Sequence, residues 1–178
     1  DLKATLVHPS LVGKTEHFIP EFSFVNQNGV VINQKYMDNK IYVANFFFTS
    51  CPSICIDLTN NLKLIQEEFA DSNDIFILSH SVDPSTDTIE RLKKYEKINQ
   101  INGKNWFLLR GEINDIVEIA QFGYFAIASS DLLVEDSLIH TENFVLIDKN
   151  KQIRGVYNGT SKLEMSYLID DIKTLQSN

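Results

Sequence analysis

Cys51 and Cys55 are the residues of this chain best suited to chemistry, and they are its only cysteines. Three residues separate them, and Pro52 directly follows the first. A proline fits the first turn of a helix because its missing N–H would have no partner there. The apolar run that ends at Phe48 therefore predicts a strand leading into a helix-opening turn, with Pro52 in the first helical position and Cys51 as the N-terminal cap residue.

The spacing of the two cysteines favours a bound metal over a disulfide. Three intervening residues place the side chains about one helical turn apart, where neighbouring Cβ atoms are roughly 5–6 Å from each other. A disulfide requires about 3.5–4.5 Å between Cβ atoms. A metal that bridges two thiolates, each at about 2.3 Å as in zinc sites, tolerates a wider separation. Both states remain reachable because the turn can relax.

Two thiolates alone leave a metal under-coordinated, which directs attention to the histidines. Of the four, His140 lies just before a predicted strand that begins at Phe144, in a loop that a sheet of this topology brings toward the cysteine turn, and Glu142 is nearby. Two soft thiolates with one imidazole suit Cu(I), and the same set can hold Cu(II). His80 could touch the site from the end of its strand, although a surface or capping role is the expected one.

The composition indicates one folded domain that does not bind nucleic acid. The chain has 178 residues, 43% of them hydrophobic, and a formal net charge of −8. No dense stripe of Lys and Arg is present to neutralise a phosphate backbone. The acidic surface suits solubility or a basic docking partner. We expect residues 1–17 to form a tail and residues 18–178 a single domain.

The order of the expected elements predicts an α/β fold with a central mixed sheet flanked by helices. Ser85 or Thr86 is expected to cap the second helix, and residues 126–143 to form an inserted loop or small hairpin before the last two strands. The expected elements are an N-terminal β-hairpin over 22–32, strands over 41–48, 75–78 and 106–109, helices over 54–70, 87–98 and 113–122, a second hairpin over 144–157, and a helix over 163–175.

Four segments together resemble the Sco family, the copper-binding assembly factors for cytochrome c oxidase. They are residues 48–55, 81–88 and 106–111, and His140 ahead of 144–148, and they occur in family order. The resemblance implies a thioredoxin-like fold and copper held by Cys51, Cys55 and His140. It also implies delivery of copper to the binuclear copper site of the oxidase, or reduction of the cysteines of that site. Asp83 matches a family acidic residue near the metal, so we expect it to support the site or partner docking, or merely to cap the turn before Pro84.

The resemblance further implies where the protein works and what it meets. The location would be extracytoplasmic, at the periplasmic face of the inner membrane or in the mitochondrial intermembrane space, with an anchoring N-terminal segment that this sequence lacks. The partner would be the copper-site subunit of the oxidase or another copper or thiol protein, and we expect a monomeric chaperone rather than an enzyme. Ile56 stands where the family often has proline, and Ser50 where histidine is common. Neither position supplies a ligand in the family, so these departures concern partner contacts and copper exchange.

Four other functions fit parts of the pattern. An extracytoplasmic thiol–disulfide oxidoreductase of thioredoxin type would use Cys51 and Cys55 as its redox pair, but no proline precedes the strand at Phe144, where that class carries its cis-proline. A peroxiredoxin would place a threonine three residues before the cysteine, whereas Thr49 lies two before it. The remaining alternatives are structural zinc with Asp83 or Asp136 as an additional ligand, and an inert disulfide.

Overall fold

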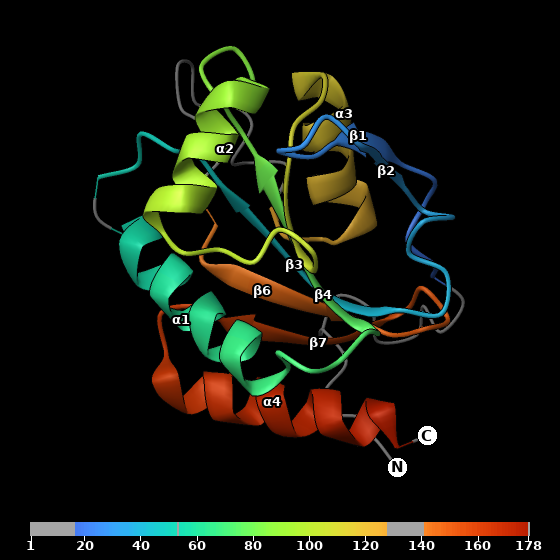
Figure 1. The fold of residues 1–178 in the computed structure, drawn as a ribbon. Coiled ribbons are helices and arrows are strands. Elements are labelled where there is room, and N and C mark those ends of the chain that lie inside the picture. The colour runs from blue at the N-terminus through green and yellow to red at the C-terminus, as the bar shows by residue number, and fades with distance from the viewer. Residues whose placement is uncertain (1–16, 53, 128–140, 178) are drawn as a thin grey trace.

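The structure is a computed structural model that describes residues 17–52, 54–127 and 141–177 (Figure 1). All of the predicted tail except His17, and most of the predicted insertion, lie outside these ranges. Five strands form a central sheet in the order β5–β4–β3–β6–β7. The strands are β3 (Ile41–Phe47), β4 (Ile75–Ser81), β5 (Trp106–Leu109), β6 (Asn143–Ile147) and β7 (Ile153–Asn158).

The sheet is mixed, as the sequence predicts. β3 lies at its centre, runs parallel to β4 with Val43 opposite Ile77, and runs antiparallel to β6 with Val43 opposite Leu146. Every residue of β3 and β4 is buried. A strand covered on both faces has a continuous apolar sequence, whereas a strand with one face in solvent alternates apolar and polar residues. This explains why the β3 segment was recognisable from its sequence.

β4 is longer than the predicted strand over 75–78, because its polar end is buried and hydrogen-bonded. Ser79 donates to the side chain of Asn45 on β3 and accepts from the indole of Trp106 on β5. Ser81 donates to the carboxylate of Asp87 at 2.7 Å. These partners satisfy hydroxyl groups that burial would otherwise leave without hydrogen bonds, so the strand continues to Ser81.

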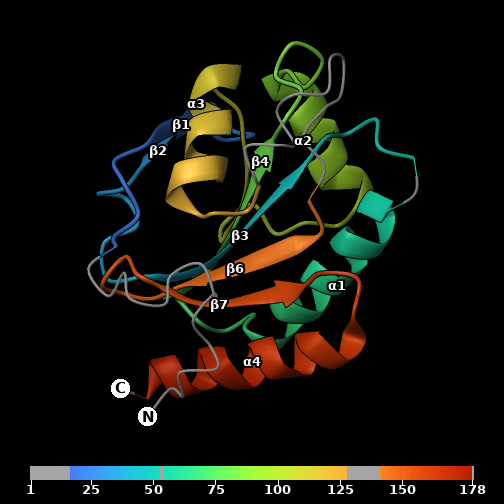
Figure 2. The same cartoon turned by 180° about the vertical axis from the view of Figure 1, so that it is seen from behind.

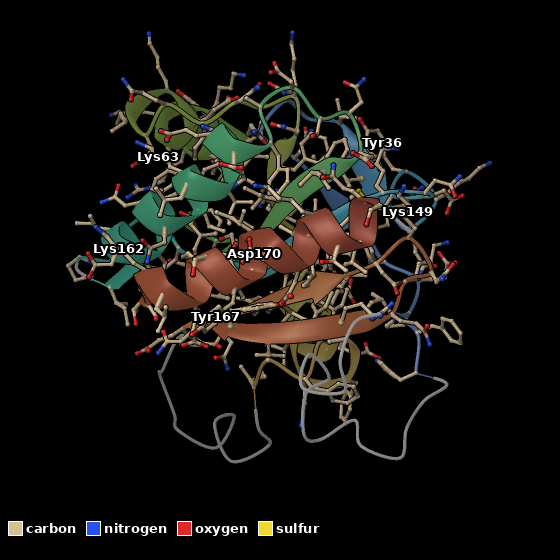
Figure 3. The ribbon with its side chains drawn as sticks, turned by 90° about the horizontal axis from the view of Figure 1, so that it is seen from below. Tyr36, Lys63, Lys149, Lys162, Tyr167 and Asp170 are labelled. Carbon is tan, nitrogen blue, oxygen red and sulfur yellow. The ribbon has the colours of Figure 1, made fainter. Side chains whose placement is uncertain are left out.

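Helices cover one face of the sheet, where α1 (Ile54–Glu68) and α4 (Lys162–Gln176) lie side by side (Figure 3). α2 (Ile89–Ile98) contributes Leu92 to the same core. Ser161 is the N-terminal cap of α4, since its hydroxyl accepts the Glu164 N–H at 3.1 Å. The core on this side consists of aliphatic side chains of the helices packed against apolar strand residues, including Leu58, Leu62, Ile65, Met165, Leu168 and Ile172.

The cap predicted for α2 is wrong. Neither Ser85 nor Thr86 caps this helix; Thr88 does, and its hydroxyl accepts the Arg91 N–H at 3.2 Å. The helix therefore starts two residues later than expected, at Ile89. Asp87, predicted as its first residue, is instead fully buried beneath the start of the helix.

The opposite face carries the predicted N-terminal hairpin and α3 (Ile113–Glu118), which continues as a π-helical turn, η3 (Ile119–Gly123). The hairpin strands β1 (Ser23–Val25) and β2 (Val31–Asn33) pair antiparallel in a small separate sheet. Backbone hydrogen bonds in both directions between Val25 and Arg110 tie the hairpin to the end of β5. Both layers thus enclose the central sheet (Figure 2). Within the described ranges, no helix combines the length and apolar character that crossing a membrane requires.

Candidate metal site

The two cysteines lie where β3 meets α1, as the sequence predicts. β3 ends at Phe47, and the chain turns so that the Cys51 N–H donates to the Phe48 carbonyl at 3.2 Å. Cys55 is in the first turn of α1 and only 6% exposed, whereas Cys51 is half-buried. Both thiols are free. α1 begins at Ile54, so the prediction of Pro52 as the first helical residue and Cys51 as the cap is wrong.

The environment of Cys55 keeps its thiol protonated in the metal-free, reduced protein. Burial, followed by a hydrogen bond to Cys51 and the charge of that sulfur, raises the pKa of Cys55 to about 12, and a hydrogen bond with the Phe48 backbone acts in the opposite direction. Burial disfavours a charged thiolate, and a second nearby sulfur adds repulsion. The two sulfurs are thus close enough for one to influence the ionisation of the other. A bound cation must therefore displace the Cys55 proton.

Asp87 anchors the loop that carries Cys51. Its carboxylate, which has no exposed surface, accepts the Thr49 N–H at 3.2 Å, the Thr49 hydroxyl, and the Ser81 hydroxyl at 2.7 Å. Thr49 is two residues before Cys51, so the carboxylate joins the cysteine loop to the end of β4. Hydrogen bonds to an ionised acceptor are stronger than neutral ones. This anchor holds the loop in position without a metal.

Arg91 of α2 clamps the same loop from outside. Its Nε–H donates to the Thr49 hydroxyl at 2.8 Å and its guanidinium donates to the Ser50 hydroxyl at 2.9 Å. Its Nε also lies 3.9 Å from the carboxylate of Asp87. Ser50, which departs from the family pattern, thus takes part in fixing the loop.

Tyr95 of α2 is a further neighbour of the thiols that the sequence reasoning missed. Its hydroxyl is 2.8 Å from the Thr59 hydroxyl of α1. Burial, partly offset by that hydrogen bond and reinforced by the charges of Cys55 and Cys51, raises the pKa of Tyr95. Asp87, Arg91 and Tyr95 all belong to the segment after β4. The one sequence signal for this segment was the family resemblance of residues 81–88, in which Asp83 matches an acidic residue near the metal.

The other predicted site residues differ in what the structure says of them. His140 and Asp136 lie outside the described residues. Asp83 accepts a hydrogen bond from the Ser85 hydroxyl at 3.0 Å within the turn after β4, which agrees with the capping alternative. In the described part of the chain, no three His, Cys, Asp or Glu side chains gather in a group that could hold a metal ion.

The segment directly after residue 140 lies beside Cys55. Thr141 and Glu142 line a cavity of about 250 Å³ together with Cys55 and apolar residues of β3 and α1. The Glu142 carbonyl accepts the Gly159 N–H at 2.7 Å, and the Gly159 carbonyl accepts the Asn61 amide of α1 at 2.6 Å. These bonds fix the start of β6 against the helix that carries Cys55.

The expectation for His80 is wrong, because this residue is neither at the surface nor in a cap. It is fully buried near the carboxyl end of β4, where Nδ1 lies 3.0 Å from the Asn45 carbonyl oxygen and the ring stacks on Phe46 at 4.9 Å. Nε2 has no hydrogen-bond partner. Burial, opposed by backbone hydrogen bonds with Asn45 and Leu78, lowers the pKa of His80 to about 4. A neutral imidazole in this position is a core residue.

Comparison with known proteins gives a consistent result. Residues 12–177 match the SCO1/SenC family. The chain is 29% identical over 162 residues to the SCO1 protein homolog of Bacillus subtilis, covering 88% of this chain and 81% of that protein. A SCO1/SenC family lipoprotein from Bacillus anthracis has a similar structure, with a TM-score of 0.80, 30% identity, and coverage of 91% of this chain and 96% of that one.

Two other solved structures share the fold. BsSco, described as having a disulfide switch and as a member of the Sco family of cytochrome c oxidase assembly proteins, has a TM-score of 0.78 and 28% identity, covering 92% of this chain and 95% of that one. ScoI of Arabidopsis thaliana with copper bound has a TM-score of 0.70 at 22% identity, covering 88% of this chain and 99% of that one. At that identity the similarity concerns the fold alone. These relatives and the mixed sheet confirm the expected thioredoxin-like fold.

Proposed function

Since the chain belongs to the SCO1/SenC family, we propose that it is a copper chaperone for cytochrome c oxidase assembly, holding its cargo with Cys51, Cys55 and His140. The observation that carries this proposal is the pair of free, neighbouring thiols at the turn from β3 into α1. Two soft sulfur ligands favour Cu(I), and an added imidazole extends the set to Cu(II).

The assignment of His140 as third ligand is supported by its neighbours in the chain. Thr141, the next residue, lines the cavity that Cys55 also lines. The hydrogen bond from Gly159 to the Glu142 carbonyl fixes this segment against α1. The positions of these two residues, which directly follow residue 140 in the chain, are what support His140 as the third ligand.

The described residues suggest how copper enters and leaves. Cys51 is the more exposed thiol and provides the first sulfur that an incoming ion or a partner's ligand meets. Cys55 is buried and protonated, so its binding releases a proton and closes the site. The contacts of Asp87 and Arg91 hold the loop in place during this exchange. Transfer to a partner then requires replacing ligands one at a time, beginning at Cys51.

We also propose an extracytoplasmic location with a membrane anchor and a monomeric state. The Bacillus anthracis relative, which is described as a lipoprotein, supports the anchor. The partner that fits this proposal best is the oxidase subunit that carries the binuclear copper site.

Thiol–disulfide exchange is the second candidate function. It is favoured by the two free thiols lying close together and by the disulfide switch described for BsSco. A reductase of this kind needs both cysteines but does not need His140, which separates the two functions experimentally.

Anaerobic titration with Cu(I) in the presence of a competing chelator tests the proposal. We expect about one copper per chain, and a loss of affinity of at least tenfold in Cys51→Ser, Cys55→Ser and His140→Ala. His17→Ala is the matched control, because it removes an imidazole that lies against η3 rather than near the thiols. Unchanged binding by His140→Ala would remove the third ligand, and retained disulfide reductase activity in that variant would favour the second function.

A further inference from the structure

A groove of about 660 Å³ lies between the segment that leads into β1 and the continuous helix formed by α3 and η3. It is remote from the cysteines: β1, β2 and α3 lie together on one side of the molecule, and the amino end of α1 lies on the other side in both views (Figures 1 and 2). The proposed copper function makes no use of this groove.

Both walls of the groove expose an aromatic ring. Phe18 on one wall is 52% exposed, and Phe122 on the other is 61% exposed. Between them Phe22 is buried and contributes to the apolar floor. Single exposed apolar side chains are common on protein surfaces, but rings that face one hollow from two elements mark a binding surface.

The rim of the same groove is acidic. Glu21, Asp115 and Glu118 line it and are exposed. None of these carboxylates forms an ion pair with a Lys or Arg of the described ranges, whereas Asp38 and Glu68 elsewhere on the surface pair with lysines. The groove therefore presents negative charge that no lysine or arginine among residues 17–52, 54–127 and 141–177 neutralises by an ion pair.

The walls are held in place by hydrogen bonds and close packing within the fold. Nε2 of His17 is hydrogen-bonded to the Gly123 carbonyl at 2.9 Å, and the Ile19 N–H donates to the Lys151 carbonyl at 2.8 Å. A Cβ at Gly123 would come within 2.8 Å of the Ile119 side chain, so the π-helical turn is closely packed at this point. The groove is thus formed before any partner arrives, which limits the entropic cost of binding.

We propose that this groove docks a segment of another protein in which arginine or lysine side chains stand beside large apolar ones. A guanidinium can stack on a phenylalanine ring while it pairs with a neighbouring carboxylate. The acidic rim repels nucleic acid and anionic lipid, so a basic protein segment is the occupant that matches both the charge and the apolar floor. Because the groove is separate from the cysteines, a partner can be held there while Cys51, the more exposed thiol, remains accessible.

Titration of the ¹⁵N-labelled chain with two synthetic peptides tests this assignment. In both peptides, charged residues alternate with leucine and phenylalanine. The charged residues are arginine in one peptide and glutamate in the other. We expect only the arginine peptide to bind, with amide shift changes in residues 18–24 and 112–123. Raising the salt concentration should weaken binding, because exposed charge pairs are screened.

Variants locate the binding surface. Asp115→Asn with Glu118→Gln, or Phe122→Ser alone, should weaken binding of the arginine peptide by about tenfold or more. Matched controls are Glu67→Gln with Asp71→Asn, which removes the same charge from another exposed surface, and Ile98→Ser, which removes an apolar side chain that is 69% exposed on α2. Both controls should bind as the original chain does.

Three results would overturn the proposal. The first is equal binding of the two peptides. The second is binding at another surface, seen as amide shift changes outside the groove or as equal loss of peptide affinity in the groove variants and the control variants. The third is a dimer in sedimentation experiments that Phe122→Ser dissociates, because the groove would then be filled by a second copy of this chain. Copper titration of the same variants should be unaffected, so failure here is distinguishable from failure of the copper assignment.

Discussion

Replacing Asp87 with asparagine should both destabilise the protein and weaken copper binding. The carboxylate is fully buried and accepts three hydrogen bonds, two from Thr49 and one from Ser81. Each bond to an ionised acceptor contributes about 1.5–3 kcal/mol. Asparagine keeps the volume and one acceptor oxygen but loses the charge, and its amide group faces donors. We therefore expect the free energy of unfolding to fall by about 2–4 kcal/mol.

The effect on copper follows from the position of Thr49, two residues before Cys51. Without its anchor the cysteine loop samples other conformations, and binding must order it again. If about 1.4 kcal/mol of the loss applies to the loop, copper affinity falls about tenfold. Urea unfolding, followed by the fluorescence of the buried and only tryptophan, Trp106, measures the first effect. Anaerobic competition with a Cu(I) chelator measures the second.

Asp148→Asn is the matched control for this variant. Asp148 is 5% exposed, accepts the Asn150 and Gln152 N–H groups at 2.9 and 3.0 Å, and pairs with Arg154 at 3.0 Å. It lies in the turn between β6 and β7. Its loss should cost comparable stability and leave copper affinity unchanged. If the two variants lose stability alike and neither loses affinity, Asp87 stabilises the fold without positioning the cysteines, and the reasoning fails.

Three further predictions concern other parts of the site and core. Burial lowers the pKa of His80 from its ordinary value of 6.5 to about 4, so between these pH values the unfolded chain binds a proton at His80 and the folded chain does not. The free energy of unfolding should therefore fall by up to roughly 3 kcal/mol as the pH drops from 6.5 to 4. Urea unfolding at a series of pH values measures this dependence, and His80→Phe should abolish it. Iodoacetamide should modify Cys51 at least tenfold faster than Cys55 in the reduced, metal-free protein, since Cys55 is buried and has a pKa of about 12. Peptide mapping by mass spectrometry measures the two rates, and faster modification of Cys55 would contradict its burial. Gly159→Ala places a Cβ 2.7 Å from the Glu142 carbonyl oxygen, so it should cost about 1–3 kcal/mol in thermal or urea unfolding and weaken copper binding by shifting the segment after residue 140.

The parts of the fold that the sequence predicts well are those in which local pattern and burial agree. The run from Ile41 to Phe47 is apolar throughout, and in the structure it is a central strand with both faces covered. The hairpin around Gly29 was recognisable for a different reason, because an Asn-Gly pair favours a turn with positive φ, and Gly29 has a φ of 75° in the structure. In both cases the neighbouring residues alone contain the information that determines the conformation.

The errors fall where a polar residue is buried by partners from elsewhere in the chain. The strand was expected to end at residue 78, but the Ser81 hydroxyl is buried and donates a hydrogen bond to Asp87, and the strand continues to Ser81. Ser85, Thr86 and Thr88 are equally good caps by residue type, and the inward position of Asp87 leaves Thr88 as the one that caps α2. Propensity cannot separate such alternatives, because tertiary contacts decide between them.

The same distinction applies to the candidate site and explains which variants test it best. The cysteine pair is a local signal, since both thiols belong to one turn. What holds that turn is not local, because Asp87 reaches Thr49 across 38 positions of the chain and Arg91 reaches Ser50 across 41. A metal site built from adjacent thiols can change its ligands easily, but only a loop fixed from outside returns to the same geometry after each exchange. The segment that positions the cysteines should therefore control how readily copper is released, while the cysteines themselves determine which metal is bound.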